Sequence, residues 1–268
     1  MEPFSFTPGT TPVLISVPHA GTHIPAELAA RMTDAALTQP DTDWHIPNLY
    51  DFAPRLGASL IVATPSRYVI DLNRDPSGKP LYPGADNTEL VPLTTFGREQ
   101  IYRPGAAPDE DEVRQRVTRY WQPYHERLTA ELDALKRRFG LVVLWDAHSI
   151  PSLVPRFFSG QLPDLNLGSA RGASAAPDLT AKIKGTLDNA GFSFVCDGRF
   201  TGGYITRHFG HPSQGMHALQ LELAQVSYMD EAPPYRWDPA RAAPLKALLE
   251  KTVSALIAWA RDNAPVKA

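Results

Sequence analysis

Two apolar segments, far apart in the chain, each lead into a histidine. Val13–Val17 is followed by His19, and Leu141–Trp145 is followed by His148. Each segment has the length and composition of a buried strand. Because ligands of open α/β sheets bind beyond the carboxyl ends of the strands, we expect the two imidazoles to bind one metal ion. A turn or strand-end histidine without a ligand would give the same local pattern, so neither histidine is specific by itself.

A third ligand is expected from a carboxylate, because catalytic zinc is often held by two histidines and one acidic residue. The segment 41–45, Asp-Thr-Asp-Trp-His, offers two aspartates. Either could bind the metal or cap the following helix, and the residues alone leave Asp41 and Asp43 open. Asp146 shares a strand face with His148, since alternate residues point the same way, and could orient that histidine.

A candidate general base lies on the segment Met216–Leu223, where apolar and polar residues alternate. This alternation places Gln220 and Glu222 on one face of a strand. A carboxylate on a buried strand is costly unless it has a partner, and burial would adjust its pKa. Glu222 is therefore a candidate base, and an exposed strand face is the alternative explanation.

Substrate-binding candidates flank the apolar segment Tyr68–Leu72. Asn73 and Arg74 follow it, where a guanidinium could bind a carboxylate through two hydrogen bonds, and Arg67 precedes it. A surface ion pair, such as Arg74 with Asp75, would explain a lone arginine equally well.

The segment 201–210 is a further candidate for ligand binding because glycines flank its polar residues. Such a loop could close over a ligand with Tyr204 and Arg207 pointing inward, and an ordinary hairpin is the alternative. The chain has neither a phosphate-binding glycine motif nor a G-x-S-x-G elbow, so neither a nucleotide-binding nor a serine-hydrolase mechanism is supported.

The elements that must position these residues alternate between strands and helices. The strands are expected at Val13–Val17, Ser59–Ala63, Tyr68–Leu72, Leu141–Trp145, Phe192–Cys196 and Met216–Leu223. The helices are expected at Pro47–Leu56, Asp109–Phe139, Asp178–Asn189 and Pro239–Asp262. This order predicts an α/β fold with a mixed, mostly parallel central sheet and helices on both faces. Pro123 should kink or divide its helix, and the irregular stretch 76–108 is expected to be an active-site loop.

The composition is that of a globular protein, with 268 residues, 43% hydrophobic and 21% charged. We expect one domain over residues 1–268. The net charge of −3 argues against nucleic-acid and anionic-membrane partners. The chain has neither a long apolar run nor a signal-peptide pattern, so a cytoplasmic location is expected. Cys196 is the single cysteine, so a metal site must use His, Asp and Glu.

Seven segments together resemble the N-formylglutamate amidohydrolase family. They extend, in the family's order, over about residues 13–230: SVPHAGTHIP, DTDWHIPNLYDFAPRLGA, SRYVIDLNRDP, LWDAHSI, LPDLNLG, GGYITRHFG and HALQLELAQ. Each is weak alone, whereas seven in register are specific. The resemblance implies a metal-dependent amidohydrolase that converts N-formyl-L-glutamate to formate and L-glutamate in histidine degradation.

The family in turn resembles the zinc carboxypeptidase and aspartoacylase fold, also called phosphorylase/hydrolase-like. In that plan a histidine after the first strand, a carboxylate and a later histidine bind a divalent metal, usually Zn²⁺. The resemblance implies that His19 and His148 are the two histidine ligands. The carboxylate of those relatives comes three residues after the first histidine, where this chain has Thr22. The acidic ligand must come from elsewhere, and Asp43 is preferred to Asp41.

The same resemblance implies that Glu222 is the base and that Asn73 and Arg74 hold a substrate carboxylate. Because glutamate has two carboxylates, a second cation is needed, for which Arg207 is expected, with Arg67 as a third. The expected partner is a small molecule bound by a monomer or small homo-oligomer. The alternatives are hydrolysis of another N-acyl amino acid or small peptide, or a non-catalytic protein that binds acidic amino acids.

Overall fold

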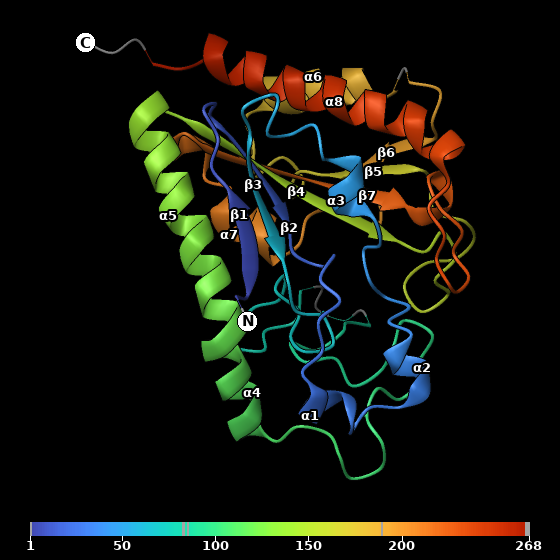
Figure 1. The fold of residues 1–268 in the computed structure, drawn as a ribbon. Helices are drawn as coiled ribbons and strands as arrows, with labels where there is room; N and C mark the ends of the chain where they lie inside the picture. Colours follow the sequence, from blue (N-terminus) through green and yellow to red (C-terminus); the bar gives the residue numbers. More distant parts are fainter. Residues whose placement is uncertain (1, 82–83, 85, 189, 266–268) are drawn as a thin grey trace.

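A seven-stranded sheet forms the centre of the computed structural model, which describes residues 2–81, 84, 86–188 and 190–265 (Figure 1). The strands are β1 (Phe4–Thr7), β2 (Val13–Val17), β3 (Ser59–Ala63), β4 (Val142–Ile150), β5 (Leu165–Gly168), β6 (Phe194–Cys196) and β7 (Met216–Ala224). Their order across the sheet is β1-β3-β2-β4-β7-β5-β6. The pairs β1–β3 and β5–β7 are antiparallel and the other neighbours are parallel, which confirms the predicted mixed, mostly parallel sheet.

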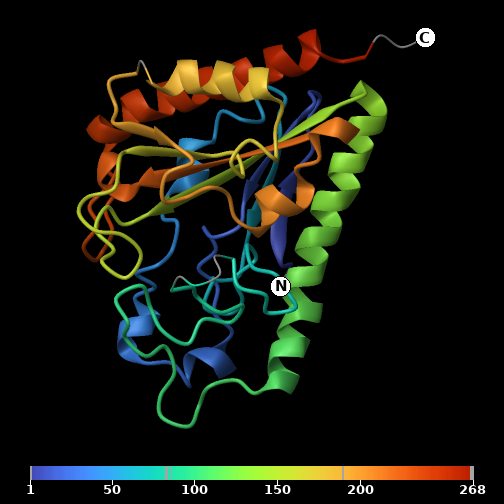
Figure 2. The ribbon, with the colours of Figure 1, turned by 180° about the vertical axis from the view of Figure 1, so that it is seen from behind.

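Helices cover both faces of this sheet, as predicted (Figures 1 and 2). They are α1 (Ala26–Ala29), α2 (Asp34–Leu37), α3 (Ile46–Leu49), α4 (Glu110–Arg116), α5 (Gln122–Phe139), α6 (Pro177–Asp188), α7 (Tyr204–Phe209) and α8 (Pro239–Asp262). One hydrophobic core joins the sheet to α3, α6 and α8, and a second joins the other face to α5 and α7. No helix in the described part of the chain is long and apolar enough to cross a membrane.

The central strand β4 shows how the sequence supplies both cores. All nine of its residues are buried, and their side chains alternate between the two faces. Val143 and Trp145 enter the core beneath α8, whereas Val142 and Leu144 enter the core beneath α5. A strand covered on both faces must be apolar on both, which explains the continuous apolar run.

The long helix predicted over 109–139 forms, and its interruption falls close to Pro123. A single π-helical segment, Val117–Trp121, joins α4 to α5 immediately before that proline. The wider π-helical turn accommodates a proline inside the helix, because a proline lacks the backbone N–H and its ring would clash with the preceding turn. The two helices therefore remain end to end (Figure 1).

Other predicted elements differ from the structure. The segment Tyr68–Leu72 is not a strand: Val69 N–H donates to Ser66 O within a turn, and Asp71 N–H donates to Leu90 O of the loop 76–108. The helix predicted over Pro47–Leu56 ends at Leu49, and turns follow it as far as Gly57, since Pro54 cannot continue a helix. The short strands β1 and β5 were not predicted, and Asn189 lies outside the described residues.

Candidate active site

The two predicted histidines meet at one edge of the sheet because β2 and β4 are adjacent and parallel. His19 lies two residues beyond β2, whereas His148 lies inside β4, which is longer than predicted. Asp43 joins them from the segment before α3, where its N–H donates to His19 O at 3.1 Å. One ligand atom of each of the three residues lies within 4.8 Å of the others, and all three residues are buried. This cluster could hold a divalent metal ion.

Each imidazole also contacts an aspartate of its own through Nε2, the ring nitrogen on the side away from Asp43. Nε2 of His19 lies 2.7 Å from Asp71 Oδ1, and Nε2 of His148 lies 3.0 Å from Asp146 Oδ2. A carboxylate in this position can hold a proton on Nε2, and the Nδ1 lone pair is then available to a metal. The Nδ1 atoms face Asp43 Oδ2, at 3.8 Å from His19 and 3.0 Å from His148.

The protonation of the cluster supports a cation at its centre. Nδ1 of His148 and Oδ2 of Asp43 lie 3.0 Å apart, and because a carboxylate oxygen only accepts, a proton or a cation must lie between them. Burial lowers the pKa of His148, but Asp146 and Asp43 raise it well above the ordinary value. Asp43 Oδ1 is also buried without a hydrogen-bond partner among the described residues. Two imidazoles and one carboxylate with these unmet needs fit a divalent metal such as zinc.

Asp41, the alternative acidic ligand, has a separate role. Its carboxylate Oδ2 accepts the Phe96 N–H at 2.9 Å, which fixes the loop that follows residue 76. Burial raises the pKa of Asp41 to about 6. The structure thus groups Asp43, and not Asp41, with the two histidines.

Glu222 lies beside the histidine cluster on the neighbouring strand. It pairs in register with His148 across the β4–β7 ladder, and its side chain is buried rather than on an exposed strand face. Gln220 Nε2 donates to Glu222 Oε2 at 3.2 Å. Burial raises the pKa of Glu222 to about 8, with His148 acting in the opposite direction. A carboxyl group in this range can both accept and donate a proton near neutral pH.

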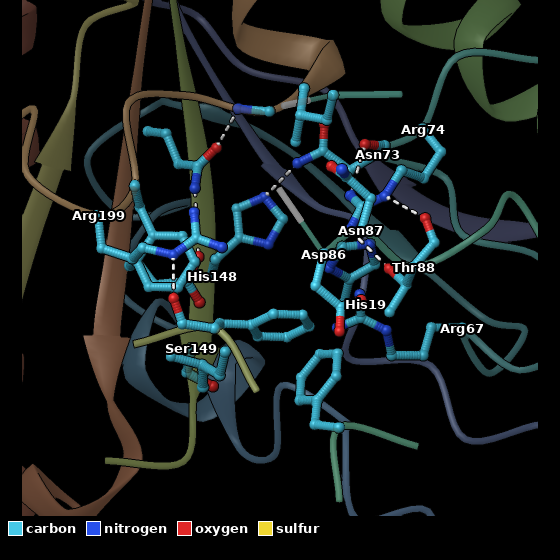
Figure 3. Close-up of a pocket in the computed structure, with 18 residues that line it drawn as sticks. His19, Arg67, Asn73, Arg74, Asp86, Asn87, Thr88, His148, Ser149 and Arg199 are labelled. Carbon is cyan, nitrogen blue, oxygen red and sulfur yellow. Dashed lines mark hydrogen bonds between the residues drawn. The ribbon is translucent and has the colours of Figure 1, made fainter. Parts of the chain in front are cut away.

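The cluster opens into a pocket, which Figure 3 shows in close-up. The predicted active-site loop 76–108 supplies part of its wall through Leu81, Asp86, Asn87, Thr88 and Phe96. Tyr82, Pro83 and Ala85 of this loop lie outside the described residues. The remaining wall contains His19, His148 and Glu222, together with three arginines: Arg67, Arg74 and Arg199.

Two predicted substrate-binding arginines line this pocket with their guanidinium groups already held. Nη2 of Arg67 lies 2.7 Å from Asp71 Oδ2, and the Arg67 guanidinium lies over the Phe96 ring at 4.7 Å. Arg74 NH2 donates to Thr88 Oγ1 at 2.7 Å, and its Nε donates to Thr88 O at 3.2 Å. The positive charge of Arg67 therefore offsets the negative charge of buried aspartates, whereas Arg74 is positioned mainly by hydrogen bonds to neutral groups.

Asn73 lines the pocket, but its amide also connects the site's framework. Oδ1 accepts the Ile205 N–H at 2.8 Å. Nδ2 lies 3.0 Å from His148 Nε2 and 3.3 Å from Asp146 Oδ2. These contacts tie the start of α7 to the histidine cluster, so the amide has a positioning role that sequence reasoning missed.

Tyr204 and Arg207 lie differently from the prediction. Residues 204–209 form the short helix α7 rather than a hairpin or an open loop. Helical geometry turns both side chains toward a neighbouring hollow that they share with Lys79 and His208. Arg207 donates to Leu81 O and to Thr201 Oγ1, each at 3.0 Å. The structure therefore does not bring these two side chains into the pocket beside the histidines.

Arg199 also lines the pocket, although sequence reasoning missed it. It follows β6 by three residues, and its Nε donates to Phe157 O at 2.6 Å. The one sequence signal for it is its place just beyond the carboxyl end of a predicted strand.

Comparisons with known proteins agree with this architecture. A family model described as N-formylglutamate amidohydrolase matches residues 11–229. Two relatives named N-formylglutamate deformylase are each 47% identical to this chain. The alignment with the Pseudomonas putida protein covers 97% of both chains. The alignment with the Pseudomonas aeruginosa protein covers 98% of both chains. A crystal structure of N-formylglutamate amidohydrolase from Ralstonia eutropha JMP134 is 25% identical with a TM-score of 0.82, covering 98% of this chain and 100% of that one. A solved Agrobacterium tumefaciens protein, 17% identical over 96% of this chain and 94% of its own, shares the fold with a TM-score of 0.71.

Proposed function

The chain belongs to the N-formylglutamate amidohydrolase family, and we propose that it hydrolyses N-formyl-L-glutamate to formate and L-glutamate, a step of histidine degradation. The observation that carries this proposal is one pocket in which His19 and His148, two members of a His-Asp-His cluster, lie beside the buried carboxyl group of Glu222. The near-full-length identity to relatives named N-formylglutamate deformylase supports the choice of substrate.

In this proposal His19, Asp43 and His148 hold the metal, and Zn²⁺ is its identity. Two nitrogen donors and one oxygen donor suit zinc and leave a coordination position open, as in catalytic sites. When bound, such a metal supplies Lewis acidity, which makes water more acidic and polarises an amide carbonyl.

Glu222 moves the proton in the proposed reaction. Its carboxylate accepts a proton from the water whose oxygen attacks the formyl carbon. The same group then donates that proton to the amide nitrogen as the C–N bond breaks, so that formate and the free amino group of glutamate leave. The raised pKa of Glu222, about 8, suits a group that must both accept and donate, and Gln220 fixes the orientation of the carboxyl.

Arg74 is the proposed partner of the carboxylate next to the reacting amide. Arg74 directly follows Asn73, and the Asn73 amide contacts His148. Nη1 of Arg74 also lies 3.8 Å from Oδ2 of Asp71, the aspartate that contacts His19. A guanidinium fixed this close to the ligand cluster can bind a carboxylate and orient the formyl group toward Glu222.

The direct test is formate release from N-formyl-L-glutamate, with metal content measured on the same sample. We expect turnover by the metal-loaded protein, loss of turnover after chelation and recovery with Zn²⁺. A substrate panel with N-acetyl-L-glutamate and N-formyl-L-methionine would identify a different N-acyl specificity. Binding of formylglutamate without turnover by the loaded protein would contradict the enzymatic proposal, and full turnover after verified metal removal would contradict the metal.

A further inference from the structure

Arg199 and Arg74 reach the pocket from opposite sides, with the two histidines between them in Figure 3. The guanidinium of Arg199 is fixed by its bond to Phe157 O, and its centre lies 5.7 and 5.4 Å from the ring centroids of Phe157 and Phe200. The bond to Phe157 uses a main-chain carbonyl, so it holds the guanidinium in place without neutralising its charge. A preorganised cation therefore lies on this wall of the pocket.

Two other charged side chains of the pocket wall, Arg67 and Asp86, are held in ion pairs. Arg67 is paired with Asp71 at 2.7 Å. Asp86 is paired with Arg156 at 2.9 Å and with Arg98 at 2.8 Å. These pairs reduce the net charge that Arg67 and Asp86 present to a ligand.

We propose that Arg199 binds the side-chain carboxylate of the substrate and so selects N-formyl amino acids with an acidic side chain. This inference rests on the proposed function, which requires two carboxylates to be bound. The α-carboxylate is two bonds from the reacting nitrogen and belongs near the histidine cluster, where Arg74 lies. The side-chain carboxylate is farther from that nitrogen and reaches the other wall.

The surroundings of Arg199 suit the rest of such a side chain. Phe157 and Phe200 line the pocket beside the guanidinium and can cover the two methylene groups of glutamate. A charge-assisted, bidentate bond at the end of this apolar wall would distinguish a carboxylate from a neutral amide of nearly the same shape. Arg199 thus takes the role that the sequence suggested for Arg207.

The test compares N-formyl-L-glutamate with N-formyl-L-glutamine, which differ in the charge of the side chain. For Arg199→Gln we expect kcat/KM to fall roughly 10- to 100-fold for formylglutamate and to change little for formylglutamine. Arg199→Lys keeps the charge without the planar fork and should retain part of the discrimination. The control is Arg138→Gln, because Arg138 is exposed on α5 and lies over Phe139 at 4.8 Å, away from the pocket.

Three outcomes separate the possibilities. An equal loss for both substrates in Arg199→Gln, or an unchanged ratio, would overturn the selection role while leaving the proposed function intact. If Arg199→Gln fails to fold, the ratio measured with Arg199→Lys decides, since full wild-type discrimination or an equal loss there would overturn the role. Wild-type protein that releases formate from neither substrate would overturn the proposed function, and this inference with it.

Discussion

Asp71 joins a candidate metal ligand to a buried arginine: its Oδ1 atom lies 2.7 Å from His19 Nε2, and its Oδ2 atom lies 2.7 Å from Arg67 NH2. Burial raises the pKa of Asp71, but Arg74, His19 and Arg67 together hold it well below the ordinary value. The carboxylate is therefore charged when it orients His19. Asp71 does for His19 what Asp146 does for His148, although the two aspartates come from different segments.

Replacing Asp71 with Asn should weaken metal binding by about 10- to 100-fold, because the amide no longer fixes the Nε2 proton of His19 as a carboxylate does. Competition with a chromogenic chelator measures this affinity directly. Asp133→Asn, an exposed change on α5, is the matched control and should keep wild-type affinity. Wild-type affinity in Asp71→Asn would contradict an orienting role.

Metal content should distinguish Asp43 from Asp41, the two candidates for the acidic ligand. Asp43→Asn removes the charge that faces both Nδ1 atoms, so the purified variant should lose most of its metal. Asp41→Asn should keep its metal, since an amide oxygen can still accept the Phe96 N–H. Elemental analysis of both variants checks this, and metal loss confined to Asp41→Asn would reverse the assignment.

The sequence predicts those parts of the site that follow from local pattern. Apolar runs of strand length locate β2 and β3 at their observed bounds, and parallel neighbours bring their carboxyl ends to one edge. The alternation of apolar and polar residues along β7 likewise predicts the strand face of Glu222, which faces the pocket. These predictions depend on a few residues in a row, which is where periodicity is informative.

The other residues of the site are positioned by contacts between segments far apart in the sequence. Asp71 lies 52 residues from His19, and the apolar run around it resembles a strand, although its carboxylate is used by His19 and Arg67. The glycines that flank the segment of Arg207 predict a loop that closes over a ligand, yet the short helix Tyr204–Phe209 directs Arg207 to another hollow. Arg199 carries no local signal beyond its place after the strand that ends at Cys196.

Glu222→Gln should lower kcat by about 100- to 10,000-fold while the metal stays bound, because the amide cannot accept the proton of the attacking water. Single-turnover formate release and metal analysis on the same sample measure the two properties. Glu126→Gln, exposed on α5, provides a matched change outside the pocket. A near-normal kcat in Glu222→Gln would exclude this residue as the base.

Two glycines should respond in opposite directions to alanine. At Gly203 an added Cβ would lie 2.3 Å from Asn73 Nδ2, so the amide that contacts His148 must move. We expect Gly203→Ala to lower kcat/KM at least about 10-fold and the unfolding free energy by about 1–3 kcal/mol. At Gly185, exposed in α6, a Cβ meets nothing within 4 Å, so Gly185→Ala should add roughly 0.5–1 kcal/mol. Kinetics and urea denaturation test both, and a fully active Gly203→Ala would contradict the coupling through Asn73.

His125 should make the protein less stable in acid. Its Nε2 lies 2.8 Å from Leu72 O, its ring stacks on Trp121 at 3.7 Å, and burial lowers its pKa from 6.5 to about 3. Between those values the unfolded chain binds a proton that the folded protein does not, so stability present above pH 6.5 is lost as the pH falls. The expected slope is about 1.4 kcal/mol per pH unit from this group. His125→Phe should flatten the urea-derived stability curve by that slope between pH 6.5 and 4.5. Parallel curves for wild type and His125→Phe would show that the histidine is protonated in the fold.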